Sequence, residues 1–280
     1  MTKNKFLALV YADLFSFPLS SEELFYWQIN WPALRNWTEE TINRLIDSED
    51  GYYFLKGAKG LVARRKDREG YSLQKLHQAK KVADQLKKLP LIEAIYVTGS
   101  VAVGNATLDC DIDLMIITKP GSLWLTRLLV VSLLKIQGVY RGPKNIENKI
   151  CTNLYLDGRH LVMGQKSLFV AHEILQARCL FDRDGCNFYW LKANEWVADF
   201  LPQAYFARLR EITQFKKSGE VFWRPLFYPL EMVSFFLQIC YMHAKMTREK
   251  VGWGYAFFHP NDLSGLIQKR FEQRLLKLEK

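Results

Sequence analysis

Two aspartates interrupt a segment that otherwise reads as a buried strand. The segment Asp111–Thr118 has the sequence DIDLMIIT, which is short and strongly apolar. In a strand, residues two apart point to the same face. Asp111 and Asp113 therefore project side by side, whereas Ile112 and Leu114 face the core. Because unpaired carboxylates are costly to bury, the pair predicts a bound divalent cation, and oxygen ligands of this kind suit Mg²⁺.

A second apolar run, Leu91–Thr98, precedes the first and ends in Gly99-Ser100. We expect a strand followed by a short helix or turn over Gly99–Asn105. Unpaired backbone N–H groups at such a turn bind anions, glycine lets a phosphate approach the backbone, and serine adds a hydroxyl donor. A phosphate site beside a metal site predicts phosphoryl-type transfer.

The combined pattern resembles a known family. Gly99-Ser100, a spacer of ten residues and the motif Asp111-Ile112-Asp113, flanked by the runs IYVTGS and DIDLMII, resemble the DNA polymerase β-like nucleotidyltransferase superfamily. The stretch GSVAVGNATLDCDIDL is particularly similar to bacterial nucleotidyltransferase-domain proteins of unassigned substrate. In those proteins a winged-helix-like segment precedes the catalytic core and a helical region follows it.

The resemblance implies a role for each motif residue. Asp111 and Asp113 would be catalytic and would hold two Mg²⁺ ions, with Mn²⁺ as the alternative metal. Gly99 and Ser100 would contact the β and γ phosphates of a nucleoside triphosphate, for which ATP is the expected substrate. An acceptor hydroxyl would attack the α-phosphorus and release pyrophosphate. Arg127, on the next helix, is a candidate phosphate ligand, although a surface or ion-pair role is the favoured interpretation.

One expected feature of the superfamily is missing. Its members usually carry a third acid on a later strand, but the matching segment Lys149–Asp157, KICTNLYLD, has no acid at its centre. Asn153 could ligate a metal through its carbonyl, and Asp157 could reach in from the strand end. If neither does so, one metal is weakly held. Asp109 is interpreted as a solvated loop residue.

The resemblance and the order of patterns predict an α+β fold in three parts. Residues 1–70 are expected to form a winged-helix-like domain, 71–160 a small mixed-sheet catalytic core, and 161–280 a helical domain on the substrate side. The helical part is rich in Trp and Tyr and would select the acceptor.

The N-terminal part has the element order of a winged helix-turn-helix. Helices are expected over residues 3–16, from the Ser20/Glu23 capping box through Ile29, and from Asn36 or Glu39 onward. A hairpin with its turn at Lys56–Gly60 would follow. The third helix, TEETINRLIDSED, is acidic, which disfavours contact with phosphates. Nucleic-acid contact and rigid packing both remain open for this domain.

The rest of the chain reads mostly as helix. A basic helix is expected over 71–90 and an apolar helix over Ser122–Ile136, before the strand Lys149–Leu156. The expected C-terminal helices are Leu168–Arg178, Asn187–Phe200, Ala204–Phe215, Leu226–Lys245 and one near Leu263–Lys280.

The charge of the chain is strongly positive and uneven. The net charge is +10, and Lys56–Lys88 alone carries 11 Lys/Arg against 3 Asp/Glu. Such a run favours polyanions, so nucleic-acid contact through Lys56–Lys88 is one interpretation and a solvated helix face is the other. A basic protein also favours an anionic acceptor, such as nucleic acid, a phosphorylated metabolite or an acidic protein surface.

Several further patterns carry no function of their own. The five cysteines form no CxxC pair, which suits a reducing, cytoplasmic setting. The N-terminal run is interpreted as an amphipathic helix, not a signal peptide. Pro225–Ala244 is interpreted as a buried core helix and not a membrane span, because it contains a proline and a glutamate. His172-Glu173 is expected to be a packed or solvent-facing pair, and His259-Pro260 a turn.

The leading hypothesis is a Mg²⁺-dependent nucleotidyltransferase acting on an unidentified acceptor. The main alternative is a catalytically weak or inactive regulator that keeps the fold and binds nucleotide or nucleic acid. A third alternative is a DNA-binding transcription factor acting through residues 1–70.

Overall fold

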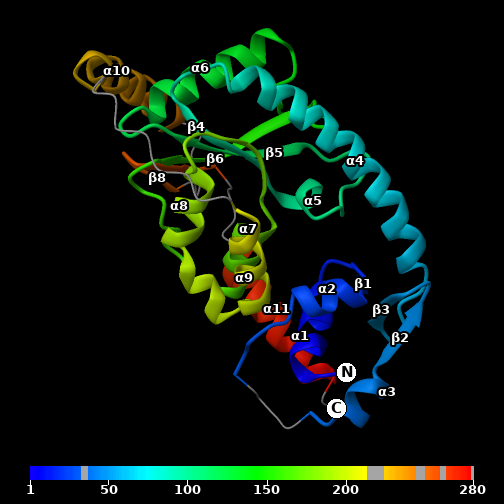
Figure 1. Ribbon diagram of the computed structural model, residues 1–280. Coiled ribbons are helices and arrows are strands. Elements are labelled where there is room, and N and C mark those ends of the chain that lie inside the picture. Colours follow the sequence, from blue (N-terminus) through cyan, green and yellow to red (C-terminus); the bar gives the residue numbers. More distant parts are fainter. Residues whose placement is uncertain (33–36, 213–223, 244–249, 259–262, 279–280) are drawn as a thin grey trace.

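A computed structural model describes residues 1–32, 37–212, 224–243, 250–258 and 263–278. A mixed sheet of six strands, in the order β7-β4-β5-β6-β9-β8, forms the centre of the described part, and a sheet of three strands lies in its N-terminal part. One long helix, α4 (Leu61–Leu86), runs along the edge of the molecule from the small sheet to the large one (Figure 1). This arrangement is α+β, as expected.

The two apolar runs on either side of Gly99-Ser100, a turn that we call the glycine bend, are neighbouring strands of the large sheet. β4 pairs antiparallel with β5 and with β7, while β5 and β6 are parallel. The sequence predicted β4, β5 and β6, but it gave no indication of the three strands from the C-terminal half. The strands of this sheet are β4 (Ile92–Val97), β5 (Ile112–Thr118), β6 (Ile150–Asp157), β7 (Arg178–Asp182), β8 (Lys250–Val251) and β9 (Tyr255–Phe257).

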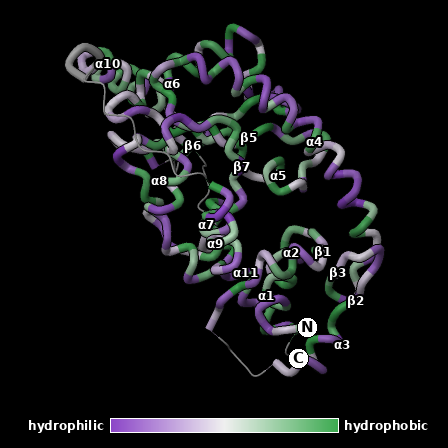
Figure 2. Tube along the Cα trace, in the orientation of Figure 1, coloured by the Kyte–Doolittle hydropathy of each residue, from purple (hydrophilic) through white to green (hydrophobic). Residues whose placement is uncertain are grey.

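Helices cover both faces of the large sheet. Ile112, Leu114 and Ile116 of β5 pack with α4 and with α6 (Leu123–Ile136) on one face. Met115 and Ile117 pack on the other face with α1 and the C-terminal helices. Figure 2 shows the hydrophobic residues along β5 and α6 and the mixed polarity of α4. By strand alternation, Asp113 lies on the same face as Met115.

The N-terminal elements follow the expected order of three helices and a hairpin, but the third helix is shorter than expected, because Ile46–Glu49 form a strand that pairs in the hairpin. The Ser20/Glu23 capping box is present at the start of the second helix. The elements are α1 (Lys3–Asp13), β1 (Leu19–Ser20), α2 (Ser21–Tyr26), α3 (Glu39–Arg44), β2 (Ile46–Glu49) and β3 (Tyr52–Leu55).

The hairpin turn was placed wrongly by the sequence interpretation. The two strands, β2 and β3, are joined at Asp50-Gly51, and both of these residues have positive φ, at 50° and 79°. Asp-Gly is the preferred dipeptide for a tight two-residue hairpin turn of this kind. The expected turn residues, Lys56–Gly60, instead link β3 to α4. That helix begins at Leu61, ten residues before the expected position.

The C-terminal half contains the expected helices. The ends expected at Phe215, Lys245 and Lys280, the start expected at Asn36 and the turn at His259-Pro260 lie outside the described residues. The helices are α7 (Leu168–Gln176), α8 (Cys186–Ala193), the 3-10 helix η1 (Glu195–Asp199), α9 (Pro202–Glu211), α10 (Arg224–His243) and α11 (Leu263–Leu278).

Helix α10 differs from the expected buried core helix. Its buried side chains include Glu231 and Gln238, which face α6, whereas Leu230, Leu237 and Tyr241 are more than half exposed. Glu231 accepts hydrogen bonds from two backbone N–H groups at the start of α6. The polar residues of α10 therefore face the interior of the protein, and an apolar face of the helix points outward. Within the described residues, no helix combines the length and apolarity needed to cross a membrane.

The first and the last described helices lie side by side (Figure 1). Phe271 of α11 packs with α1 in the larger of the hydrophobic clusters, and Arg274 bonds Asp13 at 2.8 Å. Residues from 1–70 and from 161–280 therefore share one core. The division of the chain into three domains stays a prediction.

Candidate metal centre

The two aspartates lie together at the start of β5. Asp111 immediately precedes the strand, and Asp113 is its second residue. Parallel pairing with β6 puts Cys151 directly opposite Asp113. One ligand atom from each of these three side chains lies within 4.8 Å of the others. The carboxylates therefore project side by side, and a thiol joins them from the neighbouring strand.

The glycine bend is in direct contact with the aspartate pair. Gly99 has a φ of +63°, and a Cβ atom at this position would lie only 2.8 Å from Asp113 Oδ2. The backbone N–H of Thr98 donates to the Asp113 carbonyl at 3.0 Å. Gly99 begins the short helix α5 (Gly99–Ala102), and the hydroxyl of the next residue, Ser100, donates to Cys110 Sγ at 3.7 Å. Only glycine fits here without displacing the carboxylate.

Asn153 lies beside Asp113 because β6 is irregular at this point. The register shifts so that Leu114 and Met115 pair with Thr152 and Leu154, which leaves Asn153 as the extra residue of a β-bulge. Its side-chain amide nitrogen donates to Asp113 Oδ1 at 2.6 Å. The structure thus brings Asn153 to the pair as a hydrogen-bond donor that orients one carboxylate.

Sequence reasoning missed Arg141. Its Nη1 lies 2.7 Å from Asp111 Oδ2 and 3.7 Å from Cys151 Sγ. Arg141 lies outside any strand or helix of two or more residues, thirty positions after Asp111, so no periodicity or motif pointed to it. Its guanidinium acts as a resident cation between an aspartate and the cysteine.

The electrostatics of the site favour a further cation. Burial, the nearby Asp111 and Glu173 of α7 together raise the pKa of Asp113 from 3.8 to about 7. Burial also raises the pKa of Glu173 to about 7. Burial and the two aspartates raise the pKa of the Cys151 thiol to about 12. The repulsion among these three carboxyl groups is offset in part by one guanidinium, which contacts Asp111, and added positive charge would relieve it further.

Helix α4 holds the loop that leads into the aspartate pair. The Lys75 side chain is 3% exposed, and its ammonium donates to the carbonyls of Leu108 and Cys110 at 2.9 and 2.8 Å. It also donates to Asn148 Oδ1 at 2.7 Å, just before β6. Lys75 therefore fixes the approach to both strands of the site. Two further α4 side chains hold the same loop, Arg68 through Asn105 and Ser72 through the N–H of Ala106.

Asp157 lies at the other end of β6. It pairs in register with Thr118, the last residue of β5, while Asp113 is near the first. Its carboxylate accepts from the N–H groups of Gly121 and Arg159 and forms an ion pair with the Arg159 guanidinium. The structure does not bring Asp157 to the aspartate pair, because five positions of extended strand separate them.

Arg127 lies on the opposite face of the large sheet from Asp113. It belongs to α6, where its side chain donates to Gln238 and its guanidinium carbon lies 4.2 Å from the ring centroid of Phe258. The structure therefore places Arg127 in contacts with α10 and the segment after β9, away from the glycine bend. The loop residue Asp109 is exposed, as expected.

The pair His172-Glu173 is packed, as one of its two interpretations expected. His172 is 4% exposed and stacks on Tyr11 with ring centroids 4.1 Å apart. Its burial lowers the pKa of the imidazole to about 3. His172 therefore belongs to the core, whereas its neighbour Glu173 contributes charge to the site.

Some of the basic side chains of Lys56–Lys88 make contacts inside the fold and do not face solvent. Arg65 is buried in ion pairs with Glu23 and Glu69, and Lys75 and Arg68 hold the loop described above. The remaining cations face solvent, where Lys66 and Lys87 pair with acids. The exposed basic side chains are Lys56, Lys59, Arg64, Lys66, Lys80, Lys81, Lys87 and Lys88.

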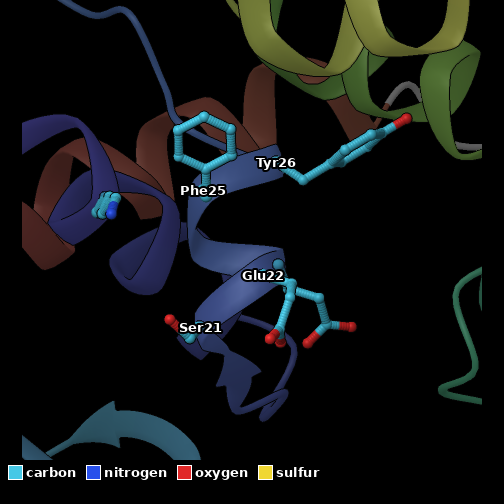
Figure 3. A pocket seen from close by; sticks show the side chains of 6 residues that line it. Ser21, Glu22, Phe25 and Tyr26 are labelled. Atoms are coloured by element: carbon cyan, nitrogen blue, oxygen red, sulfur yellow. The ribbon is translucent and has the colours of Figure 1, made fainter.

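A cavity in the N-terminal part is separate from this site. Lys5 of α1 and Ser21, Glu22, Glu23, Phe25 and Tyr26 of α2 line it (Figure 3). Glu23 serves in the helix-capping box and in an ion pair with Arg65, and no residue of the aspartate pair or of the Gly99-Ser100 bend lines this cavity. The side chains that line it include both charges and two aromatic rings, without convergent groups for one ligand.

The residues of the aspartate pair fit a divalent cation. Two carboxylates and a sulfur converge, and a guanidinium already contacts two of the three side chains. Burial, followed by the nearby carboxyl groups, raises the pKa of Asp113, so a bound cation would stabilise its charged form. Asp111, Asp113 and Cys151 are therefore the side chains able to hold a metal, with Asn153 orienting Asp113.

Comparison with known proteins agrees with this geometry. The family model described as "Nucleotidyltransferase domain" matches residues 79–142. The match runs from the second half of α4 through β4, the glycine bend, β5 and α6 as far as Arg141. It ends before β6, so it does not include Cys151. Searches of curated proteins and of solved structures gave no match.

Proposed function

We propose that this protein is a metal-dependent nucleotidyltransferase. It would move a nucleoside monophosphate from a nucleoside triphosphate to an acceptor hydroxyl and release pyrophosphate. The observation that carries the proposal is the packing of Gly99 against Asp113, which puts a glycine bend beside the aspartate pair. This contact lies within the segment that matches the nucleotidyltransferase family model. One triphosphate is then able to contact the bend and a cation on the aspartates together.

Each residue of the site has a role in this proposal. Asp111 and Asp113 would hold Mg²⁺, or Mn²⁺ as the alternative, and Asn153 would keep Asp113 in its orientation. Such a cation, when bound, offsets triphosphate charge and lowers the pKa of an acceptor hydroxyl. Gly99 has no side chain between the bend and Asp113, and the Ser100 hydroxyl, which donates to Cys110 Sγ in this structure, would turn to donate to a phosphate oxygen. The acceptor oxygen then bonds the α-phosphorus as the bond to the bridging oxygen breaks.

The acceptor is proposed to be anionic and ATP to be the donor. The chain has a net charge of +10. Lys80 and Lys81 on α4 and Lys88 just after it are exposed, near the part of the helix that packs on the large sheet. Nucleic acid, a phosphorylated metabolite or an acidic protein surface would each be attracted to such a helix.

Residues 1–70 are proposed to be a winged-helix-like packing module. The order of three helices and a hairpin supports this assignment. The exposed side of α3 carries Glu39 and Glu40, which would repel a nucleic-acid backbone. The packing of α1 on α11 supports a structural role.

A second candidate function is a nucleotide-binding regulator with little or no turnover. The observation that favours it is the composition of β6, which brings Cys151 and Asn153, but no carboxylate, to the aspartate pair. A metal held by only two carboxylates would be bound more weakly than one held by three.

Labelled ATP separates the two functions. Purified protein is incubated with ATP labelled at the α-phosphate, a divalent cation and fractionated cell extract, and both pyrophosphate release and label transfer are followed. The nucleotidyltransferase predicts both products, with transfer abolished in Asp111→Ala and retained in Asp157→Asn. Tight ATP binding without pyrophosphate, under all metals tried, would instead support the regulator.

A further inference from the structure

We propose that the third metal ligand of this site is the Cys151 sulfur, and that the site therefore binds a thiophilic divalent cation, of the class of Zn²⁺ and Co²⁺, more tightly than Mg²⁺. The inference rests on the proposed function only for the location of the site. It concerns which metal the site selects.

The position of Cys151 in the sheet supports this assignment. Parallel strands β5 and β6 put Cys151 directly opposite Asp113, so the two side chains lie on one face of adjacent strands. Its sulfur and one oxygen of each aspartate lie within 4.8 Å of one another. Asn153, the other β6 side chain at the site, presents its amide nitrogen to Asp113 and is occupied as a donor. The sulfur is thus the β6 atom placed to complete a set of three ligands.

The chemical nature of the three ligand atoms determines which metal ion the site prefers. Thiolates prefer zinc and other soft or borderline ions, whereas Mg²⁺ takes oxygen ligands in an octahedral shell. Zinc lies about 2.3 Å from sulfur and about 2.0–2.2 Å from carboxylate oxygen, so ligands on one tetrahedral ion are roughly 3.5 Å apart. Small side-chain rotations would bring the present atoms to that spacing. On binding, the metal–sulfur bond forms and the thiol proton passes to solvent.

The Arg141 guanidinium already supplies positive charge next to two of the three ligands. It contacts Asp111 and Cys151, the two side chains that a metal would draw together with Asp113. Its side chain is 43% exposed, and a partly exposed ion pair contributes little to stability. An incoming cation would therefore displace the guanidinium at small cost. Removal of the guanidinium should strengthen metal binding.

Cobalt absorption tests the assignment directly. The full-length protein is titrated with Co²⁺, and the near-ultraviolet charge-transfer absorption of a cobalt–thiolate bond is recorded. The wild-type protein should develop this band with one equivalent of metal, and Zn²⁺ should abolish it. Cys151→Ser should lose the band. Matched variants, Cys110→Ser and Cys179→Ser, should keep it, because these thiols lie outside the cluster.

Two variants test the selectivity without relying on the loss of a signal. Cys151→Asp would give the site a third carboxylate, and we expect its affinity for Mg²⁺ to rise at least tenfold while its affinity for Zn²⁺ falls. Arg141→Ala should bind Co²⁺ several-fold more tightly than the wild-type protein does. Circular dichroism of each variant confirms that it is folded before metal is added.

Two results would overturn the inference. One is a cobalt–thiolate band that persists in Cys151→Ser, and the other is a wild-type affinity for Mg²⁺ that equals its affinity for Zn²⁺. Failure of the proposed function would look different, because the band would form normally while no metal supported release of pyrophosphate.

Discussion

The ammonium of Lys75 and the side-chain oxygen of Asn148 lie 2.7 Å apart, and this contact joins α4 to the segment just before β6. The same ammonium also bonds two carbonyls of the loop that precedes Asp111. We expect Lys75→Met to lower the free energy of unfolding by about 2–4 kcal/mol, because the three hydrogen bonds made by a buried ammonium are lost. Urea unfolding measures the change. Lys80→Met, on the exposed side of the helix, should change stability by less than about 0.5 kcal/mol. Equal effects of the two substitutions would contradict the anchoring role.

Arg65 makes a second buried connection, between α4 and the N-terminal elements. Its guanidinium bonds Glu23 at 2.6 and 2.7 Å, Glu69 at 2.7 Å and the carbonyl of Pro18. We expect Arg65→Met to lower the free energy of unfolding by about 2–3 kcal/mol. The loss is smaller than for a fully buried ion pair, because water can still solvate the carboxylates that lose their partner. Thermal unfolding measures the loss. The exposed Arg64→Met is the control, and a loss of equal size there would argue against this contact.

The steric clash between a side chain at position 99 and the Asp113 carboxylate can be measured separately from backbone strain. Gly99 and Gly138 have similar positive φ values, +63° and +67°, but only at Gly99 would an added Cβ meet another atom within 4 Å. We expect Gly138→Ala to cost about 1 kcal/mol, the strain of the left-handed backbone. Gly99→Ala should cost more and should also weaken divalent metal binding, because Asp113 must move. Calorimetric titration with Mn²⁺ measures the second effect. Unchanged metal affinity in Gly99→Ala would contradict the close packing.

His172 makes stability sensitive to acid. Burial lowers its folded-state pKa from 6.5 to about 3. Below pH 6.5 the unfolded chain therefore takes up a proton that the folded protein does not, and the contribution of His172 to stability falls as the pH drops from 6.5 toward 3. Asp113 and Glu173, whose pKa values are raised to about 7, act in the opposite direction, so the effect of His172 is measured as a difference between proteins that share these two groups. The contribution is about 2 kcal/mol between pH 7 and pH 5, at 1.36 kcal/mol for each pKa unit. In His172→Phe, which can keep the stack on Tyr11, this loss should disappear.

Urea unfolding at pH 7 and pH 5 measures the difference between the wild-type protein and His172→Phe. His77→Phe, at an exposed position on α4, serves as the control and should keep the wild-type pH dependence. An equal loss in all three proteins would show that other groups dominate the acid response.

The two ends of the paired strands β5 and β6 should respond differently to loss of a carboxylate. Asp113→Asn should abolish stabilisation by a divalent cation, because it removes a charged ligand from the cluster. Asp157→Asn should leave it intact, although the protein itself should be less stable, since the buried Asp157 carboxylate accepts from Gly121 and Arg159. The shift of the unfolding midpoint with added Mn²⁺ measures both outcomes. Loss of metal stabilisation in both variants would return Asp157 to the set of candidate ligands.

The local patterns of the sequence predicted the centre of the fold. Apolar runs of strand length gave β4 and β5, the spacing of two in Asp111 and Asp113 gave their common direction, and the Ser20/Glu23 pair gave the start of α2. Each of these features depends on residues close together in the chain, where periodicity and capping chemistry act directly.

The features that the sequence did not reveal depend on distant contacts. Cys151 joins the aspartates only through the register of β5 and β6, and Arg141 reaches them from an irregular loop. The short strands β8 and β9 are too brief to show an alternating pattern. The orientation of α10 depends on Glu231, whose carboxylate is satisfied by N–H groups more than a hundred residues earlier. Contacts between residues so far apart in the chain leave no pattern in the neighbouring sequence.

The packing of α11 against α1 sets an order for biosynthesis. As the chain leaves the ribosome, α1 emerges more than two hundred residues before the helix that covers part of its apolar side. The apolar side of α1 must therefore remain incompletely buried over that interval of synthesis, and its core closes only when α11 arrives.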